Sequence, residues 1–262
     1  MSRSISALIA ALIAIVTLAG ASAAADYHLS PAQVDLIHIL APPPAPASAR
    51  GRADLQCVLE AQRHRTLTEI ESARADAQLS VFRFADVMGP RFKPQNLPFM
   101  TTFFARVTAA GEHAIAPAKK YFDRPRPHVA DHEITPLVGN MNGYNSYPSG
   151  HATFAYETAI LLAAMVPEKS AAIFARADRF AENRVIAGVH YPTDLAAGRI
   201  CGSVIDNVLM HEPRFETDFA RASAEVRHAL ALAASPAPMT QNRSTPPAVI
   251  IGSTYDSSCP CF

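Results

Sequence analysis

The stretch that decides the fold is residues 148–195, PSGHATFAYETAILLAAMVPEKSAAIFARADRFAENRVIAGVHYPTDL. Ser149 is a preferred N-cap residue ahead of an apolar run, and Pro167 suits the first turn of a second helix. After the turn GVHYP, Thr193 is expected to cap a third helix that ends near Leu209. Successive helices with almost no strand-like alternation of apolar and polar residues predict an all-α protein.

Helical patterns also precede this stretch. Thr66-Leu-Thr-Glu69 has the spacing of a capping box, and the short apolar run 81–88 ends at Gly89-Pro90. Residues 97–122 form one or two further helical patterns. Pro-rich segments flank this body. The sequence therefore predicts a single-domain helical bundle, organised as a signal peptide (1–25), a Pro-rich N-terminal segment (26–53), the bundle domain (54–234) and a Pro-rich disordered C-terminal tail (235–262).

Composition narrows the function only broadly. The chain has 262 residues, of which 49% are hydrophobic, and its 23 basic residues balance 23 acidic ones. This length and apolar content suffice for a continuous core. A formal charge of zero is unlike the basic profile of a non-specific nucleic-acid binder, so we expect no nucleic-acid binding.

The N-terminus has the pattern of a secretory signal peptide. Arg3 precedes an apolar run from Ile5 to Gly20, and small residues follow as far as Ala25. The alternative, a membrane anchor, needs about 20 apolar residues and usually stronger basic flanks. No later segment is long enough to span a bilayer. We therefore expect a periplasmic or secreted protein with no integral membrane segment in its mature form.

Export would place the four cysteines where disulfides persist. Four cysteines allow three pairings, and the sequence does not choose among them. Cys57 and Cys201 sit in apolar helical contexts, where they are either bridged or simply two small buried side chains. Cys259-Pro-Cys261 lies in the C-terminal tail, and its context supports neither a zinc half-site nor a redox pair.

Charged and histidine side chains gather at the helix junctions. In chain order they are Lys119, Arg126, Ser149, Gly150, His151, Arg184, His190 and Asp194. A helix N-terminus with Arg and Lys offers bidentate donors, a point charge and a favourable dipole to a tetrahedral oxyanion. Two histidines can serve one displacement as nucleophile and general acid, and the spacing lets Asp194 fix the tautomer of His190.

Three motifs carry a family resemblance: Lys119-x6-Arg126-Pro127, Pro148-Ser149-Gly150-His151 and Arg184-x5-His190-x3-Asp194. Together they resemble the signature of the type 2 phosphatidic acid phosphatase superfamily. An exported form is most similar to the bacterial class A non-specific acid phosphatases, which are related to vanadium haloperoxidases. The resemblance implies their all-α fold and hydrolysis of small-molecule phosphate monoesters, with phosphotransfer as a side activity. The family's phosphatases need no metal or other cofactor, and its members often form homo-oligomers.

Position by position, the resemblance implies a role for each of these residues. His190 would be the nucleophile that forms a phosphohistidine, His151 would protonate the leaving alcohol and then activate water, and Asp194 would orient His190. The phosphate oxygens would be bound by Lys119, Arg126, Ser149, Gly150 and Arg184. The chain has Asn183 where the family's third motif commonly has Ser, which puts a supporting contact in doubt.

Other interpretations stay open on the sequence alone. The crowded residues His128, Asp131, His132 and Glu133 match no standard zinc pattern and could line the substrate mouth instead. Arg124 lies two residues before Arg126 and could be a supporting cation behind the residues that bind phosphate. An aromatic leaving group could pack against three tyrosines, Tyr144, Tyr147 and Tyr191, or these side chains could instead belong to the hydrophobic core. The same pocket would also suit a vanadate-dependent haloperoxidase, a lipid phosphate phosphatase or a phosphate-binding protein without catalysis.

Overall fold

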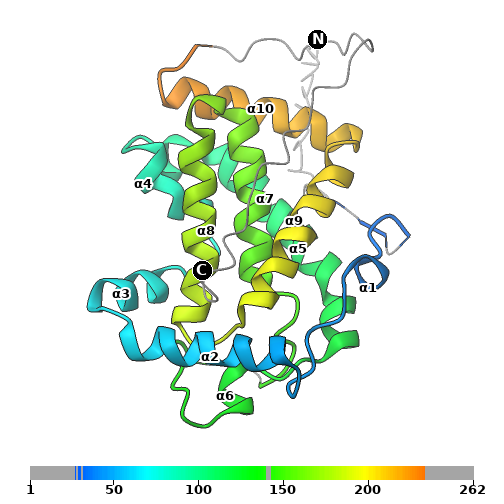
Figure 1. Ribbon diagram of the computed structural model, residues 1–262. Helices are drawn as coiled ribbons and strands as arrows, with labels where there is room; N and C mark the ends of the chain where they lie inside the picture. Colours follow the sequence, from blue (N-terminus) through cyan, green and yellow to red (C-terminus); the bar gives the residue numbers. More distant parts are fainter. Residues whose placement is uncertain (1–26, 28, 31, 140–142, 234–262) are drawn as a thin grey trace, which may run out of the picture.

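The computed structural model describes residues 27, 29–30, 32–139 and 143–233, and these residues form helices and turns without a β-strand (Figure 1). The signal peptide expected over 1–25 and the tail expected over 235–262 lie outside the described residues. The helices are α1 (Leu36–Ile39), α2 (Ala49–His64), α3 (Leu67–Ala75), η1 (Val81–Phe84), α4 (Ala85–Met88), η2 (Pro94–Asn96), α5 (Pro98–Phe122), α6 (Pro127–Ala130), α7 (Gly150–Met165), η3 (Pro167–Lys169), α8 (Ser170–Ile186), α9 (Pro192–Leu209) and α10 (Pro213–Ala229).

Helix α7 is the centre of the bundle. Its residues are apolar or small on nearly every side, and a helix with that composition is buried all round. It packs along α8 and α9, and α5 lies against it as well. Figure 1 shows α7, α8 and α9 side by side, with α2 crossing the end where α8 stops and α9 begins. That end of the bundle brings the beginnings of α7 and α9 together.

Two glycines let α9 approach the first turns of α7 closely. A Cβ atom on Gly198 would lie 2.6 Å from the carbonyl oxygen of Ser149, and one on Gly202 would lie 2.9 Å from that of Thr153. No side chain fits at these distances, so both positions require glycine. The backbone N–H of Ser149 also donates to the carbonyl of Asp194 at 3.0 Å. These contacts fix the start of α9 beside the start of α7.

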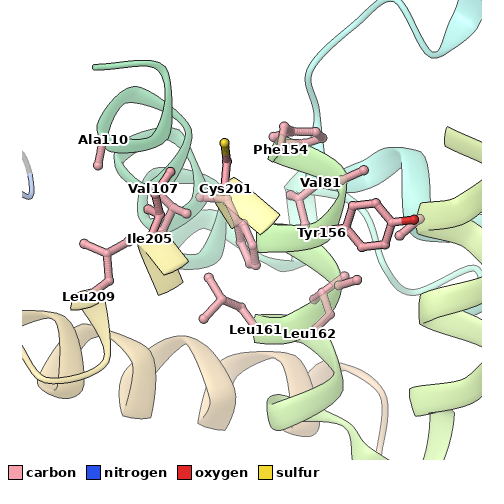
Figure 2. Packing of buried hydrophobic residues seen from close by; sticks show 14 of the residues in the cluster. Val81, Val107, Ala110, Phe154, Tyr156, Leu161, Leu162, Cys201, Ile205 and Leu209 are labelled. Carbon is pink, nitrogen blue, oxygen red and sulfur yellow. The ribbon is translucent and has the colours of Figure 1, made fainter. Parts of the chain in front are cut away.

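One large hydrophobic cluster fills the space between the helices. Figure 2 shows part of it, where α5, α7 and α9 contribute side chains to a shared interior. Residues labelled there include Val107 from α5, Leu161 and Leu162 from α7, and Ile205 and Leu209 from α9. The all-α helical-bundle prediction is confirmed.

Most of the expected helix boundaries are confirmed. Ser149 caps α7 by accepting from the backbone N–H of Ala152, and Thr66 and Glu69 form a capping box at α3. The expectation for Thr193 is wrong: α9 begins at Pro192, and its N-cap is Tyr191. The Thr193 hydroxyl instead contacts the carboxylate of Asp54 on α2, because a residue inside the first turn points away from the cap position.

Helix α2 begins earlier than the sequence indicates. It starts at Ala49, so residues 49–53, expected to belong to the Pro-rich segment, are its first turn. Ser48 caps it by accepting from the backbone N–H of Gly51 at 3.0 Å.

The two cysteines of the helical domain, Cys57 and Cys201, are both buried and are not bonded to each other. No helix in the described ranges has the length and apolarity needed to cross a membrane.

Candidate active site

The ring of His190 is held in one tautomer by neighbours with fixed hydrogen-bonding roles. Its Nδ1 lies 3.2 Å from Oδ2 of Asp194, a carboxylate that only accepts, so Nδ1 carries the proton. Its Nε2 lies 3.2 Å from Nη1 of Arg126, which only donates, so Nε2 presents a lone pair. Burial, to which the charge of Arg126 adds, lowers the pKa of His190 to about 3. The imidazole is therefore neutral at mildly acidic pH.

Asp194 is a buried carboxylate with four donors around it. Besides His190, it accepts from the hydroxyl of Ser146 at 2.6 Å, from the backbone N–H of Tyr191 at 2.9 Å and from Arg124 at 2.6 Å. Burial by itself would raise the pKa of Asp194, but the hydrogen bond from His190 and the charges of His190 and Arg124 lower it to about 2. Asp194 is ionised wherever the protein is folded at ordinary pH.

Arg124 supports Asp194 from the side opposite His190. Its Nη2 donates to Oδ2 of Asp54 at 2.8 Å, and its guanidinium lies 3.9 Å above the ring of Tyr191. Arg124 is therefore a supporting cation of this site, as expected from the sequence: it binds the two carboxylates and does not line the cavity described below.

His151 lies in the first turn of α7, within reach of the same cavity. Its Nε2 is 3.1 Å from the carbonyl oxygen of Ala77, which only accepts, so Nδ1 is the nitrogen that can take up a further proton. The ring also faces that of Phe180, with centroids 6.3 Å apart. Burial, followed by the charge of Arg184, lowers the pKa of His151 to about 3. A second proton on this ring requires an anion nearby.

Lys119 and Arg126 bring two cations to the histidines. Lys119, in the last turn of α5, donates to the carbonyl oxygens of Pro148 at 2.6 Å and Asn145 at 3.0 Å. Burial, then the charge of Arg126, lowers the pKa of Lys119 to about 8. Arg126 donates to the carbonyl of Val189, the residue before His190, at 2.9 Å. These hydrogen bonds to backbone carbonyl oxygens fix the orientation of both cationic side chains.

Arg184 is a third cation, buried in the last turn of α8. Its side chain is among the largest fully buried ones, and it forms no salt bridge within the described residues. Nη1 lies 3.4 Å from the carbonyl of Ala73, and Nε has no hydrogen-bond partner in the described part of the chain. Burial lowers the pKa of Arg184 to about 10, so it stays charged at neutral pH. A bound anion would supply the acceptor that Nε lacks.

A cavity of about 320 Å³ lies among these groups. Five of the eight residues expected from the sequence line it: Lys119, Arg126, Gly150, His151 and His190. Three further residues that the sequence did not indicate also line it: Leu79, Glu112 and Ile115. Asp194, Ser149 and Arg184 are buried behind that lining. Cationic, imidazole and backbone donors therefore converge on a space that fits a small tetrahedral anion.

Gly150 lies close to two side chains that line the cavity. A Cβ atom there would lie 3.3 Å from Cδ1 of Ile115, a tight contact, and 3.7 Å from Cε of Lys119, an ordinary van der Waals contact. An alanine here would fit if the Ile115 side chain moved by a few tenths of an ångström. The expectation that Ser149 and Gly150 bind phosphate oxygens stays a prediction, since the hydroxyl of Ser149 already caps α7.

Asn183 does not line the cavity. Its Nδ2 donates to Oδ2 of Asp76 at 2.8 Å and to the hydroxyl of Ser72 at 3.0 Å. Asp76 is also bound by Arg176 at 2.7 Å and by Arg83 at 2.8 Å. Asn183 thus belongs to a buried polar network that joins α3 to α8, and it immediately precedes Arg184 in the sequence.

Several other side chains that the sequence singled out do not line the cavity. Tyr147 and Tyr191 are buried, whereas Tyr144 is half exposed. Within the described residues, no group of three or more His, Cys, Asp or Glu side chains is placed to hold a metal ion, and this includes the stretch from His128 to Glu133.

Sequence reasoning missed two supports of the central carboxylate, Ser146 and Asp54. Ser146 lies in the turn-rich loop before α7, where its type gives no signal of a partner. Asp54 is on α2, 70 residues from Arg124 and 139 residues from Thr193, both of which it contacts. Only the tertiary arrangement brings these residues to Asp194 and Arg124.

Comparison with known proteins agrees with this site. A PAP2 superfamily model matches residues 100–217. The non-specific acid phosphatase of Salmonella typhimurium is 29% identical over 208 residues, which cover 76% of this chain and 83% of the relative. The acid phosphatase of Zymomonas mobilis is 29% identical over 77% of this chain and 79% of its own, and the non-specific acid phosphatase of Providencia stuartii is 26% identical over 76% and 84%.

The matched residues 100–217 contain every residue of the three motifs and of the cavity except Leu79. The fold and the site define a helical domain with a cavity that two histidines and two cationic side chains line. Over residues 100–217 the chain is similar to the PAP2 superfamily. The relatives that it matches over most of their length are named acid phosphatases.

Proposed function

We propose that this acid phosphatase is exported, accepts a broad range of small phosphate monoesters and transfers their phosphoryl group through a phosphohistidine at His190, without a metal. The observation that carries the proposal is the pair of contacts that fixes His190: Asp194 at Nδ1 and Arg126 at Nε2. A neutral imidazole with its lone pair on Nε2 and a carboxylate on its other nitrogen is what nucleophilic attack on phosphorus requires.

The first step makes one bond and breaks one. The Nε2 lone pair of His190 forms a bond to phosphorus while the bond from phosphorus to the leaving oxygen breaks. Asp194 stabilises the positive charge that develops on the imidazole, because its carboxylate accepts from Nδ1. Lys119, Arg126 and Arg184 offset the charge on the phosphoryl oxygens.

The leaving oxygen takes its proton from His151. Because the pKa of this ring is about 3 in the empty cavity, the proton enters with the substrate as the monoanion of the ester. The second pKa of a phosphate monoester is about 6, so the monoanion is available on the acid side of neutrality. The bound phosphoryl group then offsets the charge of Arg184 beside His151, which favours protonation of Nδ1.

The second step reverses these roles. His151, now neutral, accepts a proton from water as the water oxygen bonds to phosphorus, and the bond between phosphorus and His190 breaks. Inorganic phosphate leaves as its monoanion with the proton that His151 took up, so His151 is neutral again and His190 regains its lone pair. An alcohol in place of water would give phosphotransfer by the same route.

Three buried or partly buried cations support the proposal that no metal takes part, since they supply the positive charge that a metal ion gives in other phosphatases. The expected signal peptide supports export, as does the absence of a membrane-spanning helix from the described residues.

The test is hydrolysis of p-nitrophenyl phosphate from acid to mildly alkaline pH, with EDTA present, beside His190→Ala. Activity that survives EDTA, peaks on the acid side and disappears in His190→Ala is expected. Loss of activity in EDTA contradicts the metal-independent mechanism. Full activity in His190→Ala contradicts the assignment of the nucleophile.

The role of His151 has a separate test. His151→Ala should lose far more activity on an alkyl phosphate than on p-nitrophenyl phosphate, because nitrophenolate leaves without a proton. Equal losses on the two esters contradict a general acid at this position.

A further inference from the structure

The mouth of the catalytic cavity carries a carboxylate that the phosphoryl chemistry does not use. Glu112, on α5, lines the same cavity as Lys119, Arg126 and the two histidines. Its side chain is exposed, and within the described residues it forms no salt bridge or side-chain hydrogen bond that would offset its charge. The negative charge of Glu112 does not help a phosphatase to bind the phosphoryl group, because that group is itself anionic.

The position of Glu112 on α5 shows which part of a substrate it meets. Glu112, Ile115 and Lys119 follow one another at spacings of three and four residues, so they lie along one face of the helix. Seven residues of helix span about 10 Å, which separates Glu112 from the cation at the phosphate end. Ile115 lies between them, in van der Waals range of the Gly150 position.

The chemical character of the cavity therefore changes from one end to the other. Lys119, Arg126 and the histidines make the phosphate end cationic, Ile115 and Leu79 make the middle apolar, and Glu112 makes the outer end anionic. The phosphoryl group occupies the cationic end, so the leaving alcohol extends past the apolar middle toward Glu112. The charge at the far end of the leaving group then determines the sign of its interaction with Glu112.

A second carboxyl group behind Glu112 does not add to this charge. Glu157 is fully buried on α7. Burial, then the charge of Glu112, raises its pKa well above the usual value, so Glu157 is protonated and neutral at mildly acidic pH. The negative charge at the outer end thus comes from Glu112.

We propose that Glu112 determines specificity for the leaving group, favouring phosphate monoesters of alcohols that carry an ammonium group and disfavouring those that carry a second anion. The inference rests on the proposed phosphatase function and concerns the part of the substrate that the family chemistry leaves undefined. Glu112 acts by charge on the leaving group and takes no part in bond making.

The test uses three esters of matched length: 6-aminohexyl phosphate, hexyl phosphate and 6-phosphonooxyhexanoate. Their remote substituents are cationic, neutral and anionic, and lie too far from the leaving oxygen to change its basicity appreciably. Wild-type kcat/KM is expected to fall in that order, by roughly fivefold at each step at low salt. A high salt concentration should reduce the differences in kcat/KM among the three esters, because the outer end of the cavity is open to solvent.

Glu112→Gln keeps the size of the side chain and removes its charge. In this variant the ratio of kcat/KM for the amino ester to that for the carboxylate ester should fall by about tenfold. Glu216→Gln is the matched control, since Glu216 is exposed on α10 at the other end of the bundle and its loss changes the net charge equally. That control should leave the ratio at the wild-type value.

The outcomes separate this inference from the proposed function. If the wild-type enzyme hydrolyses all three esters without discrimination, or if Glu112→Gln and Glu216→Gln give the same ratio as wild type, the assignment of Glu112 is overturned while the phosphatase stands. If none of the esters is hydrolysed under any condition, the proposed function fails and the specificity fails with it.

Discussion

Nδ1 of His190 lies 3.2 Å from Oδ2 of Asp194, four residues further along the chain and in the first turn of the next helix. The same carboxylate accepts from the backbone N–H of Tyr191, which lies between the two. A local turn thus fixes the carboxylate, and the carboxylate fixes the ring. The orientation of the His190 ring therefore depends in part on the way α9 begins.

Asp194→Asn tests this relationship. The amide can donate as well as accept, so Nδ1 loses the partner that keeps its proton there, and Nε2 no longer presents a lone pair reliably. We expect kcat to fall by roughly 10³–10⁴-fold. Ser146→Ala keeps the carboxylate and should cost much less. Circular dichroism of each variant checks that it is folded, and comparable losses in the two folded variants would contradict the tautomer argument.

Anion binding should weaken as the solution becomes alkaline. The pKa of Lys119 is lowered to about 8, so its positive charge is present below that pH and is lost as the pH rises through it. Sulfate is a suitable probe because its own charge does not change in this range. Its dissociation constant should rise by up to about tenfold per pH unit above pH 8, the limit for one proton.

Lys119→Arg is the control for that titration. An arginine stays charged throughout the range, so any weakening should begin at a higher pH in the variant. Sulfate affinity that is independent of pH between 7 and 10 in the wild-type protein would exclude Lys119 as the titrating anion ligand.

A buried pair of carboxyl groups should make stability depend on pH. Glu157 on α7 and Asp206 on α9 are each about 1% exposed and retain oxygens without hydrogen-bond partners among the described residues. Burial, then the neighbouring charges of Glu112 and Glu157 respectively, raises both pKa values well above the ordinary ones. The folded state therefore holds protons that the unfolded state releases first.

The sign follows from that difference. Below pH 4 both states are protonated and the pair has no effect, whereas the free energy of unfolding falls as the pH rises through the ordinary carboxyl range. Urea unfolding at several pH values should show this fall, and the double variant Glu157→Gln, Asp206→Asn should reduce it. A pH dependence identical to that of the wild-type protein would show that the pair does not titrate.

Asn183 should matter for stability and not for substrate. It donates to Asp76 and Ser72, away from the cavity. Asn183→Ala leaves the Asp76 carboxylate with fewer donors and should lower the free energy of unfolding by about 1–3 kcal/mol. KM should change less than twofold in the variant. A tenfold rise in KM, with the protein folded, would instead place Asn183 in contact with the phosphate.

The sequence was sufficient to predict most of the helices and the contacts between residues that lie close together in the chain. Ser149 as an N-cap and the pairing of His190 with Asp194 both follow from short-range geometry, and both are confirmed. The beginning of α9 was misplaced because Thr193 has the type of a cap residue, whereas its hydroxyl binds Asp54 in the folded protein. A side-chain type alone cannot distinguish a local partner from a distant one.

Contacts between segments that are distant in the chain could not be predicted from the sequence. Arg124 was recognised as a nearby cation, but its position between Asp54 and Asp194 depends on how α2 crosses the bundle. Glu112 was not indicated at all, because an exposed glutamate on a helix is ordinary until the cavity beside it is known. The lining of a cavity is a property of several elements together, and no single stretch of sequence contains it.

The measurement that tests the central claim most directly is trapping of the phosphoenzyme. The protein is mixed with a ³²P-labelled monoester in EDTA and quenched in alkali, because a phosphohistidine survives alkali and is lost in acid. Label on the peptide that contains His190 in the wild-type protein, with none on His190→Ala, is the predicted result. Turnover without any trapped label, or label that persists in His190→Ala, would contradict a phosphohistidine at this residue.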